Sequence, residues 1–396
     1  MYLWSVLKRQ WLHMLKNMEN KIYHILVLNL GTTSFKYKLF EVTNKSEKEI
    51  ANGAYENVGS LGTMSHMDAF AETEKTLKQK NVLKSFKELD AVGYKAVHAG
   101  DLTGSRIIDK NILKIMEQYS AFAPAHNPIY ISVMRDMKKR FPELLQIGCF
   151  ETTFHSTVPE KRVLYGVPYE WKENYGIRKY GFHGSSHNYI SWKMKEEAPE
   201  CNKIISFHLG GSSSVCAIEN GKSIASSMGA TPQSGLFQNN RVGDFDVFCL
   251  PKLMDEFNND WKTILKELST KGGLLGVSGL SNNMKEIVES ANSGNERCKL
   301  TVDAYIDNLV GYAGMFDAYL KGADALVFTG GIGLGSNYLR ERVCEELAYK
   351  GIVIDKKANS VGNEGIISTP ESKIKVYMWK TNEELMVMRQ CLKLLR

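Results

Sequence analysis

The sequence of 396 residues contains no long apolar run and no closely spaced pair of cysteines. Nothing in it approaches the roughly 18 consecutive apolar residues of a membrane-spanning helix, so stable membrane insertion is not expected. The seven cysteines are odd in number, widely spaced and free of any C-x-x-C motif. This pattern is typical of reduced thiols in a cytoplasmic protein, and it argues against a structural zinc site.

A strong excess of one charge is also missing. The formal net charge is +6, and half of it comes from residues 1–22. The remainder is small and scattered, so it does not favour a nucleic-acid partner. Hydrophobic residues make up 43% and charged residues 24% of the chain, which is ordinary for a folded globular protein. A chain of this length usually forms two domains, each with its own core.

Residues 1–22 are unusual because apolar residues recur there at helical spacing between basic ones. The apolar positions are Trp4, Leu7, Trp11, Met14, Leu15 and Met18, and the basic ones among them are Lys8, Arg9 and Lys16. Three interpretations compete: a targeting or encapsulation helix, a helix that adsorbs to a surface, or translation from an upstream start codon. We favour the third, with Met14 or Met18 as the true start, and the fold is expected to begin near Ile22.

The rest of the chain alternates between strand-like and helix-like segments. The run "YHILVLNLG" (23–31) has the length and apolar character of a buried strand, and "FKYKLFEV" (35–42) alternates like a strand paired beside it. In the second half, "NKIISFHLG", "SVCAIENGK" and "DALVFTGGIG" also read as strands. Apolar residues at helical spacing over 301–320 predict a helix that leads into the strand at 324–328. This alternation predicts α/β sheets.

One pattern occurs twice. Residues 28–34 read "LNLGTTS" and residues 207–213 read "FHLGGSS", each between two strand-like segments. The repetition predicts two domains built on one plan. A glycine followed by small hydroxyl residues between two strands also lets backbone N–H groups approach a phosphate.

Four further segments carry polar residues at predicted strand ends. They are "TGGIGLGSN" (329–337), "NNRVGDFD" (239–246) with Arg241 near Asp244 and Asp246, and the histidine-bearing "RKYGFHGSSHNYI" (178–190) and "FAPAHNP" (122–128). Taken singly, each has a simple structural interpretation: a turn, a surface ion pair or a structural histidine. Together they favour phosphoryl transfer, in which positioning and charge neutralisation provide most of the catalysis.

Eleven blocks of the sequence, in this order, resemble acetate and propionate kinases, which belong to the acetate and sugar kinase, heat-shock-70, actin superfamily. The blocks are "LNLGTTSFKYKLFE", "AVGYKAVHAG", "APAHNP", "FETTFHSTVPE", "YGFHGSSHNYI", "HLGGSSSVCAIENGK", "SMGATPQSG", "NNRVGDFD", "GGLLGVSGLS", "DALVFTGGIG" and "TNEEL". The resemblance runs from about residue 23 to the C-terminus. It implies an α/β fold of duplicated ribonuclease-H-like (actin-like ATPase) domains with an interdomain cleft. The expected domains are 23–153 with about 376–396, and 154–375.

The resemblance implies reversible, direct in-line transfer of a phosphoryl group from ATP to acetate or propionate, giving ADP and the acyl phosphate. Mg²⁺ or Mn²⁺ is the implied metal and a homodimer the implied assembly. A carboxylate is already ionised at pH 7 and needs no general base. Such a site therefore requires cations and histidines rather than a catalytic acid and base.

The resemblance also assigns roles to individual positions. Asn29 and Glu383 match residues that hold the metal. The nucleotide positions are Thr32, Ser34 and Lys36 of the first hairpin, His208, Leu209, Gly210, Gly211 and Ser212, the motif Asn283, Met284 and Lys285, and Gly330, Gly331, Ile332, Gly333 and Leu334. Arg241, His126 and His183 match residues that orient the carboxylate and neutralise the transferring phosphoryl group.

Several positions depart from the family pattern. Lys95 stands where the family has arginine, and Glu151 where it has aspartate, and the two changes could compensate each other. At the nucleotide site, Asn283 and Lys285 replace aspartate and arginine, and Leu334 replaces glutamate. Two alternatives follow: a pyrophosphate-dependent or altered-nucleotide acyl kinase, and a catalytically weak regulatory or binding member of the family.

The expected pocket for the acyl group departs at one position. Val97, Phe182 and Pro232 match the family, whereas Ala125 replaces a leucine. The smaller side chain leaves room for one or two more carbons, unless a bulky neighbour such as Tyr130 fills the space. We therefore expect an acid larger than acetate, such as propionate.

Overall fold

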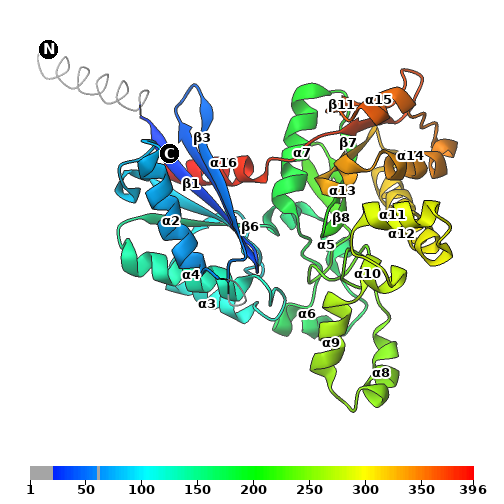
Figure 1. Cartoon of the computed structure of the whole chain (residues 1–396), viewed down its shortest axis with the longest axis horizontal. Helices are drawn as coiled ribbons and strands as arrows, with labels where there is room; N and C mark the ends of the chain where they lie inside the picture. Colours follow the sequence, from blue (N-terminus) through cyan, green and yellow to red (C-terminus); the bar gives the residue numbers. More distant parts are fainter. Residues whose placement is uncertain (1–20, 60–62) are drawn as a thin grey trace, which may run out of the picture. The chain divides into compact units, whose positions relative to one another are not determined.

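The computed structural model describes residues 21–59 and 63–396, which separate into two compact units (Figure 1). Unit 1 contains the described residues up to Thr153 together with Glu384–Arg396, and unit 2 contains Phe154–Glu383. Most of the segment 1–22, with its three competing interpretations, lies outside the described residues. Among those residues, no helix is long and apolar enough to cross a bilayer. All seven cysteines are free thiols.

Unit 1 is built on a six-stranded sheet with the order β3-β2-β1-β4-β6-β5. The strands are β1 (Tyr23–Leu30), β2 (Ser34–Val42), β3 (Glu47–Glu56), β4 (Ala91–Ala96), β5 (Ser105–Ile107) and β6 (Leu145–Phe150). Strands β1, β4 and β6 are parallel to one another. Strands β2, β3 and β5 run antiparallel to the strands with which they pair in the sheet, which are β1, β2 and β6 respectively. The predicted strands at 23–31 and 35–42 are thus confirmed as β1 and β2.

Helices cover both faces of this sheet because its central strand is apolar on both sides. Leu26 and Leu28 of β1 pack into a core with the helices α2 (His66–Gln79), α3 (Lys110–Gln118) and α4 (Asn127–Arg140). Ile25 and Val27 point the other way, into a second core formed with α16 (Glu383–Leu395). A short helix, η1 (Phe86–Glu88), precedes β4. The α16 helix therefore brings the end of the chain against the sheet formed by its beginning.

Unit 2 repeats this plan with the strand order β11-β12-β10-β7-β8-β9. Its strands are β7 (Lys203–Leu209), β8 (Ser213–Glu219), β9 (Lys222–Ser226), β10 (Ala325–Thr329), β11 (Gly365–Ile366) and β12 (Lys375–Met378). As in unit 1, three parallel strands are flanked on one side by two strands that continue as an antiparallel meander and on the other by one antiparallel edge strand. The duplicated α/β architecture expected from the repeated "LNLGTTS" and "FHLGGSS" segments is confirmed, and β1 corresponds to β7.

The helices of unit 2 cover its sheet on both faces (Figure 1). Helix α7 (Gly184–Glu197) packs on one face, and α12 (Glu296–Leu320) with α11 (Met284–Asn292) and α14 (Asn337–Glu346) pack on the other. The helix expected over 301–320 therefore begins five residues earlier, where Asn295 caps it. The remaining helices are η2 (Thr153–Thr157), α5 (Glu160–Val163), α6 (Tyr169–Tyr175), η3 (Val247–Cys249), α8 (Leu250–Glu256), α9 (Trp261–Thr270), α10 (Gly273–Ser278), α13 (Gly330–Gly335), η4 (Ala348–Lys350) and α15 (Lys356–Val361).

One expected boundary needs a correction. The stretch 376–383 was assigned to the first domain, but Lys375–Met378 form β12, which pairs with β10 in the sheet of unit 2. The chain therefore returns to unit 1 at Glu384 rather than near residue 376. The physical reason is that Val376 and Met378 bury their side chains in the core of unit 2.

Candidate active site

In unit 1, the first hairpin places its polar residues at the carboxyl end of the central strand. Asn29 is the penultimate residue of β1 and pairs with Lys36 on β2. The N–H of Gly31 donates to the Ser34 carbonyl oxygen over 2.8 Å and closes the turn. A Cβ atom at Gly31 would lie 2.6 Å from the Ser34 hydroxyl, so glycine keeps this turn tight. The side chains of Thr32 and Lys36 are exposed, as a phosphate-contacting loop requires.

The expected metal position lies beside the start of α16. The Asn29 Nδ2 donates to Oε1 of Glu384 over 3.2 Å, and the Lys38 ammonium lies 3.8 Å from the other oxygen of that carboxylate. The residue that contacts Asn29 is thus the neighbour of the expected Glu383. The described residues contain no group of three or more His, Cys, Asp or Glu side chains that could hold a metal. Amide and carboxylate oxygens in small number fit Mg²⁺, which keeps several waters and also binds substrate phosphates.

Lys95 lies on β4, and Glu151 directly follows the end of the neighbouring parallel strand β6. Lys95 pairs with Cys149 of β6, and the Glu151 N–H donates to the Ala96 carbonyl over 2.9 Å. This register brings both residues to the carboxyl ends of adjacent parallel strands. Burial raises the pKa of Tyr130; the positive charge of Lys95 opposes that shift and the negative charge of Glu151 adds to it. Both charges therefore act on the same buried hydroxyl.

His126 directly precedes α4, and hydrogen bonds of the next residue hold this part of the backbone in place. It is the N-cap residue of the helix but makes no side-chain capping bond. The next residue, Asn127, is fully buried, and its amide donates to the carbonyls of His98 and Met116, both over 2.9 Å. These two bonds fix the start of α4 and therefore the place from which the His126 side chain leaves the backbone.

The residues of the expected acyl pocket are divided between the units. Val97 is half-buried and Ala125 exposed in unit 1, whereas Phe182 and Pro232 are buried in unit 2. Tyr130, the candidate to fill the space left by Ala125, is buried in unit 1. Its hydroxyl accepts a hydrogen bond from the Leu30 N–H over 2.9 Å, and its ring packs edge-on against Tyr94. Tyr130 is therefore committed to the core.

In unit 2, His183 occupies a conformation that few non-glycine residues adopt. Its φ is +56°, in the left-handed region, at the N-cap of α7. The Nδ1 atom lies 2.8 Å from the hydroxyl of Ser214. Its ring lies against that of His208, with 4.2 Å between the centroids, and His208 contacts the Ser186 hydroxyl over 2.7 Å. Backbone strain held by such contacts is characteristic of functional positions.

Two further histidines behind His183 are completely buried. His155 contacts the Ser223 hydroxyl and the Phe182 carbonyl, both over 2.8 Å, and burial lowers its pKa to about 4. Burial also lowers the pKa of His187 well below its usual value, and the neighbouring His155 and His208 add to this effect. Both rings are therefore neutral. Sequence reasoning noticed the four-residue spacing of His183 and His187 but did not identify the serines that hold them.

Arg241 is bound by neutral oxygens. Its NH1 atom donates to the Ser212 hydroxyl over 3.1 Å, and to Gln238 Oε1 and the Pro232 carbonyl, each over 3.4 Å. Burial lowers the pKa of its guanidinium, which still remains charged because its ordinary value is so high. Gln238, which the sequence analysis did not single out, is fully buried and also accepts from Ser212 over 2.6 Å.

The two nearby aspartates do not neutralise Arg241. The Asp244 carboxylate accepts from the Gly235 N–H and the Tyr312 hydroxyl, and Asp246 caps η3 through the Phe248 N–H. Within the described part of the chain, no carboxylate forms an ion pair with Arg241, so the simple interpretation of a surface ion pair does not hold. A partly buried cation of this kind is suited to an anionic ligand.

The loops that are expected to bind the nucleotide follow the ends of β7 and β10. Gly330 has a φ of +81°, and a Cβ atom there would lie 2.5 Å from the Leu209 carbonyl oxygen, so only glycine allows this approach. A cavity of about 540 Å³ opens beside the loops. Seven expected nucleotide residues line it, namely Gly210, Gly211, Asn283, Met284, Lys285, Gly331 and Ile332. Sequence reasoning missed the other lining residues, which are Val288, Glu289, Gly335, Ser336, Asn337 and Tyr338.

The other expected nucleotide residues do not line this cavity. Gly333 and Leu334 instead offer their carbonyls to the buried guanidinium of Arg340, over 2.7 and 2.8 Å. That contact anchors α13 to α14. At Asn283 the amide oxygen caps α11 by accepting from the Lys285 N–H over 3.0 Å, so this substituted residue still starts its helix.

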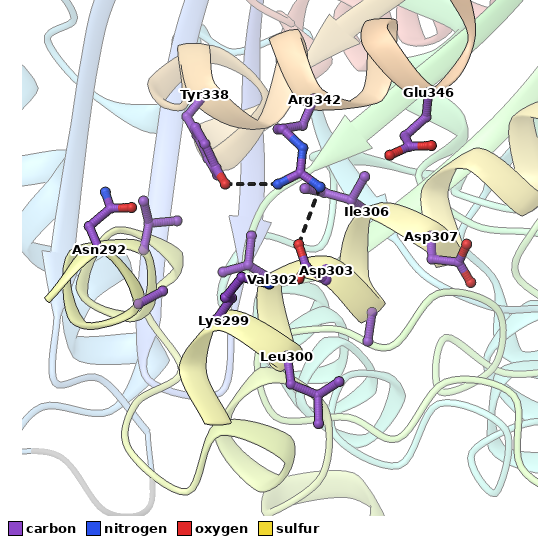
Figure 2. A pocket seen from close by; sticks show the side chains of 13 residues that line it. Asn292, Lys299, Leu300, Val302, Asp303, Ile306, Asp307, Tyr338, Arg342 and Glu346 are labelled. Atoms are coloured by element: carbon purple, nitrogen blue, oxygen red, sulfur yellow. Dashed lines mark hydrogen bonds and ion pairs between the residues drawn. The ribbon is translucent and has the colours of Figure 1, made fainter. Parts of the chain in front are cut away.

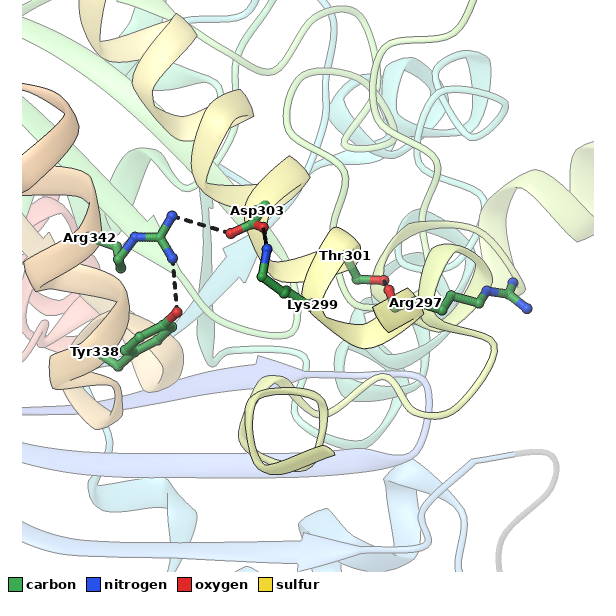
Figure 3. A network of polar contacts seen from close by, with 6 residues as sticks. All are labelled: Arg297, Lys299, Thr301, Asp303, Tyr338 and Arg342. Carbon is green, nitrogen blue, oxygen red and sulfur yellow. Dashed lines mark hydrogen bonds and ion pairs between the residues drawn. The ribbon is translucent and has the colours of Figure 1, made fainter. Parts of the chain in front are cut away.

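Tyr338 lines this cavity and also a second one of about 670 Å³, whose lining side chains are drawn in Figure 2. Its hydroxyl accepts a hydrogen bond from Arg342 NH1 over 2.9 Å, and Arg342 NH2 contacts Asp303 over 3.2 Å (Figure 3). Asp303 also accepts from Lys299 over 3.0 Å, and the bonds from Lys299 and Arg342 lower the pKa of its carboxyl group. This network ties the ring of Tyr338 on α14 to α12.

Comparisons with known proteins find relatives that match nearly the whole chain. A model of the acetokinase family matches residues 24–389. The chain is 38% identical over 395 residues to the acetate kinase of Carboxydothermus hydrogenoformans, with 93% of this chain and 98% of that protein covered. It is 37% identical over 390 residues to the acetate kinase of Halothermothrix orenii, with 92% and 98% covered.

Solved structures give the same result. The acetate kinase of Porphyromonas gingivalis superimposes with a TM-score of 0.84 at 34% identity, covering 94% of this chain and all of that one. A propionate kinase from Francisella tularensis reaches a TM-score of 0.85 at 32% identity, covering 93% of this chain and 98% of its own. Because the family model and these relatives span more than nine-tenths of the chain, the protein belongs to the acetokinase family.

Proposed function

We propose that this protein is a short-chain carboxylate kinase that transfers a phosphoryl group from ATP to acetate or propionate, reversibly and in a direct in-line displacement. The observation that carries this proposal is the environment of Arg241. Its guanidinium is partly buried, bound to Ser212 of the nucleotide loop, and held by neutral oxygens. A phosphoryl group in transfer spreads negative charge over its equatorial oxygens, and a preorganised cation of this kind stabilises that charge.

The remaining residues position and neutralise rather than exchange protons with the acid. The acceptor carboxylate is ionised at neutral pH, so no base has to activate it. His183, held by Ser214 at the start of α7, and His126, at the start of α4, are proposed to contact the phosphoryl group and the carboxylate. Asn29, Glu383 and the adjacent Glu384 are the residues that would hold Mg²⁺, or Mn²⁺ in its place. A divalent ion would neutralise phosphate oxygens.

We propose a nucleotide, rather than pyrophosphate, as the phosphoryl donor. The cavity of about 540 Å³ has the size range of small-molecule sites and provides both glycine-rich loops and an aromatic wall. Tyr338, tied to Arg342, offers a flat ring of the kind on which a base can stack. The substitutions at Asn283 and Lys285 leave the start of α11 intact. These features support a retained base site.

We propose a homodimer, and an exposed apolar surface on unit 2 supports this assembly. Its side chains are Phe245, Val247, Phe248, Trp261 and Leu265, of which Phe248 is 86% and Trp261 56% exposed. They lie on and beside α8 and α9, at one edge of unit 2 (Figure 1). Sedimentation equilibrium should give a dimer, and Phe248→Asp should shift the protein toward monomer. A monomeric wild-type protein at micromolar concentration would contradict the proposal.

Acyl phosphate formation, trapped as the hydroxamate, tests the function and the size of the acid together. With ATP, the enzyme should convert propionate with a kcat/KM at least equal to that for acetate, because Ala125 leaves space and Tyr130 is committed elsewhere. One methylene in an apolar pocket discriminates by roughly 1–3 kcal/mol. Ala125→Leu should shift the preference toward acetate. A clear preference for acetate that Ala125→Leu does not alter would exclude the enlarged pocket. Turnover with pyrophosphate but not with ATP would exclude a nucleotide donor.

Replacement of Arg241 tests the observation on which the mechanism depends. Arg241→Ala should lower kcat by about two orders of magnitude or more, as expected for a group that meets transition-state charge in a shielded site. Arg241→Lys should recover only part of the loss, because a point charge replaces the planar fork. The control is Arg135→Ala, which removes an exposed ion pair with Glu117 in unit 1. Wild-type turnover in folded Arg241→Ala would remove this residue from the mechanism.

Lys95 and Glu151 should behave as a coupled pair. Lys95→Arg or Glu151→Asp alone should lower kcat/KM or leave it unchanged, whereas the double variant should recover activity. The reason is that Lys95 on β4 pairs beside the end of β6, which Glu151 directly follows, and the effects of neighbouring charges are not additive. A double-mutant cycle on kcat/KM measures the coupling. Strict additivity would show that the two positions act independently.

A further inference from the structure

One hydroxyl group in unit 2 is shared by two imidazole rings. Ser214 Oγ, on β8, lies 2.8 Å from Nδ1 of His183 and 2.8 Å from Nε2 of His187. The other nitrogen of His187, Nδ1, lies 3.0 Å from the Ser206 hydroxyl on β7. Ser206, His187 and Ser214 are all fully buried. These groups form a continuous chain, Ser206 to His187 to Ser214 to His183, that runs from the core to the partly exposed ring of His183.

The number of protons in this chain is limited. His187 is buried among neutral groups and its pKa is strongly lowered, so it carries one ring proton and one lone pair. Ser214 has a single hydroxyl proton and can donate it to only one of the two rings. The direction of the hydrogen bonds along the chain therefore decides which nitrogen of His183 carries a proton.

Two directions are possible. In the first, Nε2–H of His187 donates to Ser214, and Ser214 donates to Nδ1 of His183, whose own proton must then be on Nε2. In the second, His187 carries its proton on Nδ1 and donates it to Ser206, Ser214 donates to Nε2 of His187, and Nδ1–H of His183 donates to Ser214. A cationic His183, protonated on both nitrogens, fits the second direction without leaving a buried polar group unsatisfied.

We propose that Ser214, supported by His187 and Ser206, is a positioning residue that fixes the ring of His183 through Nδ1 and keeps a proton on Nε2 for the transferring phosphoryl group. This inference rests on the proposed role of His183 in phosphoryl transfer. Phosphoryl oxygens only accept hydrogen bonds, so Nε2 is useful to them only when it is protonated. The chain provides that state for the neutral ring in its first direction and for the cationic ring in its second.

A buried serine elsewhere in unit 2 supplies a matched control. Ser223 on β9 is also fully buried, and its hydroxyl lies 2.8 Å from Nδ1 of the buried His155. Ser223→Ala thus removes the same kind of bond without touching His183. If loss of a buried serine–histidine bond acts only through stability, Ser223→Ala and Ser214→Ala should have similar effects on activity.

The experiment combines kinetics with imidazole ¹⁵N NMR spectra of the full-length protein. Ser214→Ala should lower kcat by about tenfold or more with little change in the KM for ATP, since misplacement of a reacting group costs rate more than binding. Its His183 spectrum should change from a dominant Nε2–H tautomer toward a mixture. Ser214→Thr, which keeps the hydroxyl, should preserve both properties, and Ser223→Ala should leave both at wild-type values.

Several outcomes would overturn the inference. They are a wild-type kcat in folded Ser214→Ala, an unchanged His183 tautomer in that variant, or equal losses in Ser214→Ala and Ser223→Ala. If Ser214→Ala does not fold, a Ser214→Thr variant with a low kcat and a mixed tautomer would overturn it instead. Failure of the proposed function is distinguishable, because a wild-type protein that forms no acyl phosphate would still show, in the NMR spectra, whether Ser214 sets the tautomer.

Discussion

The charge of Arg241 has to be balanced from outside its immediate environment, and much of the site in unit 2 follows from that requirement. Ser212, Gln238 and the Pro232 carbonyl orient the guanidinium but do not neutralise it. A shielded cation held by neutral oxygens binds an anion more strongly than an exposed one, because water competes less. Since Ser212 belongs to the loop after β7, the same contact ties this cation to the loop expected to bind phosphate. One hydroxyl therefore fixes the position of Arg241 relative to that loop.

The histidines of unit 2 differ in burial: two are buried and neutral, and two are only partly buried. His155 and His187 are buried, and their lowered pKa values keep them uncharged. A buried positive charge would be costly in this environment, and neutral imidazoles avoid it while still offering a donor and an acceptor each. His183 and His208 lie in front of them and are only partly buried. The serines between the rings make this division possible, because a hydroxyl can serve a ring in either protonation state.

Unit 1 carries charges of both signs at the carboxyl ends of its parallel strands. Lys95 lies near the end of β4, Glu151 directly follows β6, and the Glu384 carboxylate reaches Asn29 from α16. The departures from the family pattern at Lys95 and Glu151 preserve the sign of each charge while changing its reach. Such paired changes keep the electrostatic balance of a site while altering its geometry.

The sequence alone was sufficient for the fold class, because the evidence for it is local. Apolar runs of strand length predicted β1 and β7, and the repeated glycine and hydroxyl turns after them predicted the duplication. The glycines of the nucleotide loops could also be read directly, since only glycine allows the backbone of Gly330 to approach Leu209 so closely. The return of the chain to unit 1 at Glu384 could not be placed, because a four-residue strand such as β12 has no distinctive pattern of its own.

The site needed tertiary structure because its contacts join residues that are distant in the chain. Asn29 and Glu384 are 355 positions apart, and His183 and Ser214 are 31 apart. Composition and periodicity indicate that a serine lies in a strand, but not which ring its hydroxyl meets. The sequence by itself thus determined the strands, the duplication and the family. Only the packing of α7 against β7 and β8 decided which histidines are neutral, since burial and hydrogen-bond partners, rather than residue type, set the pKa of an imidazole.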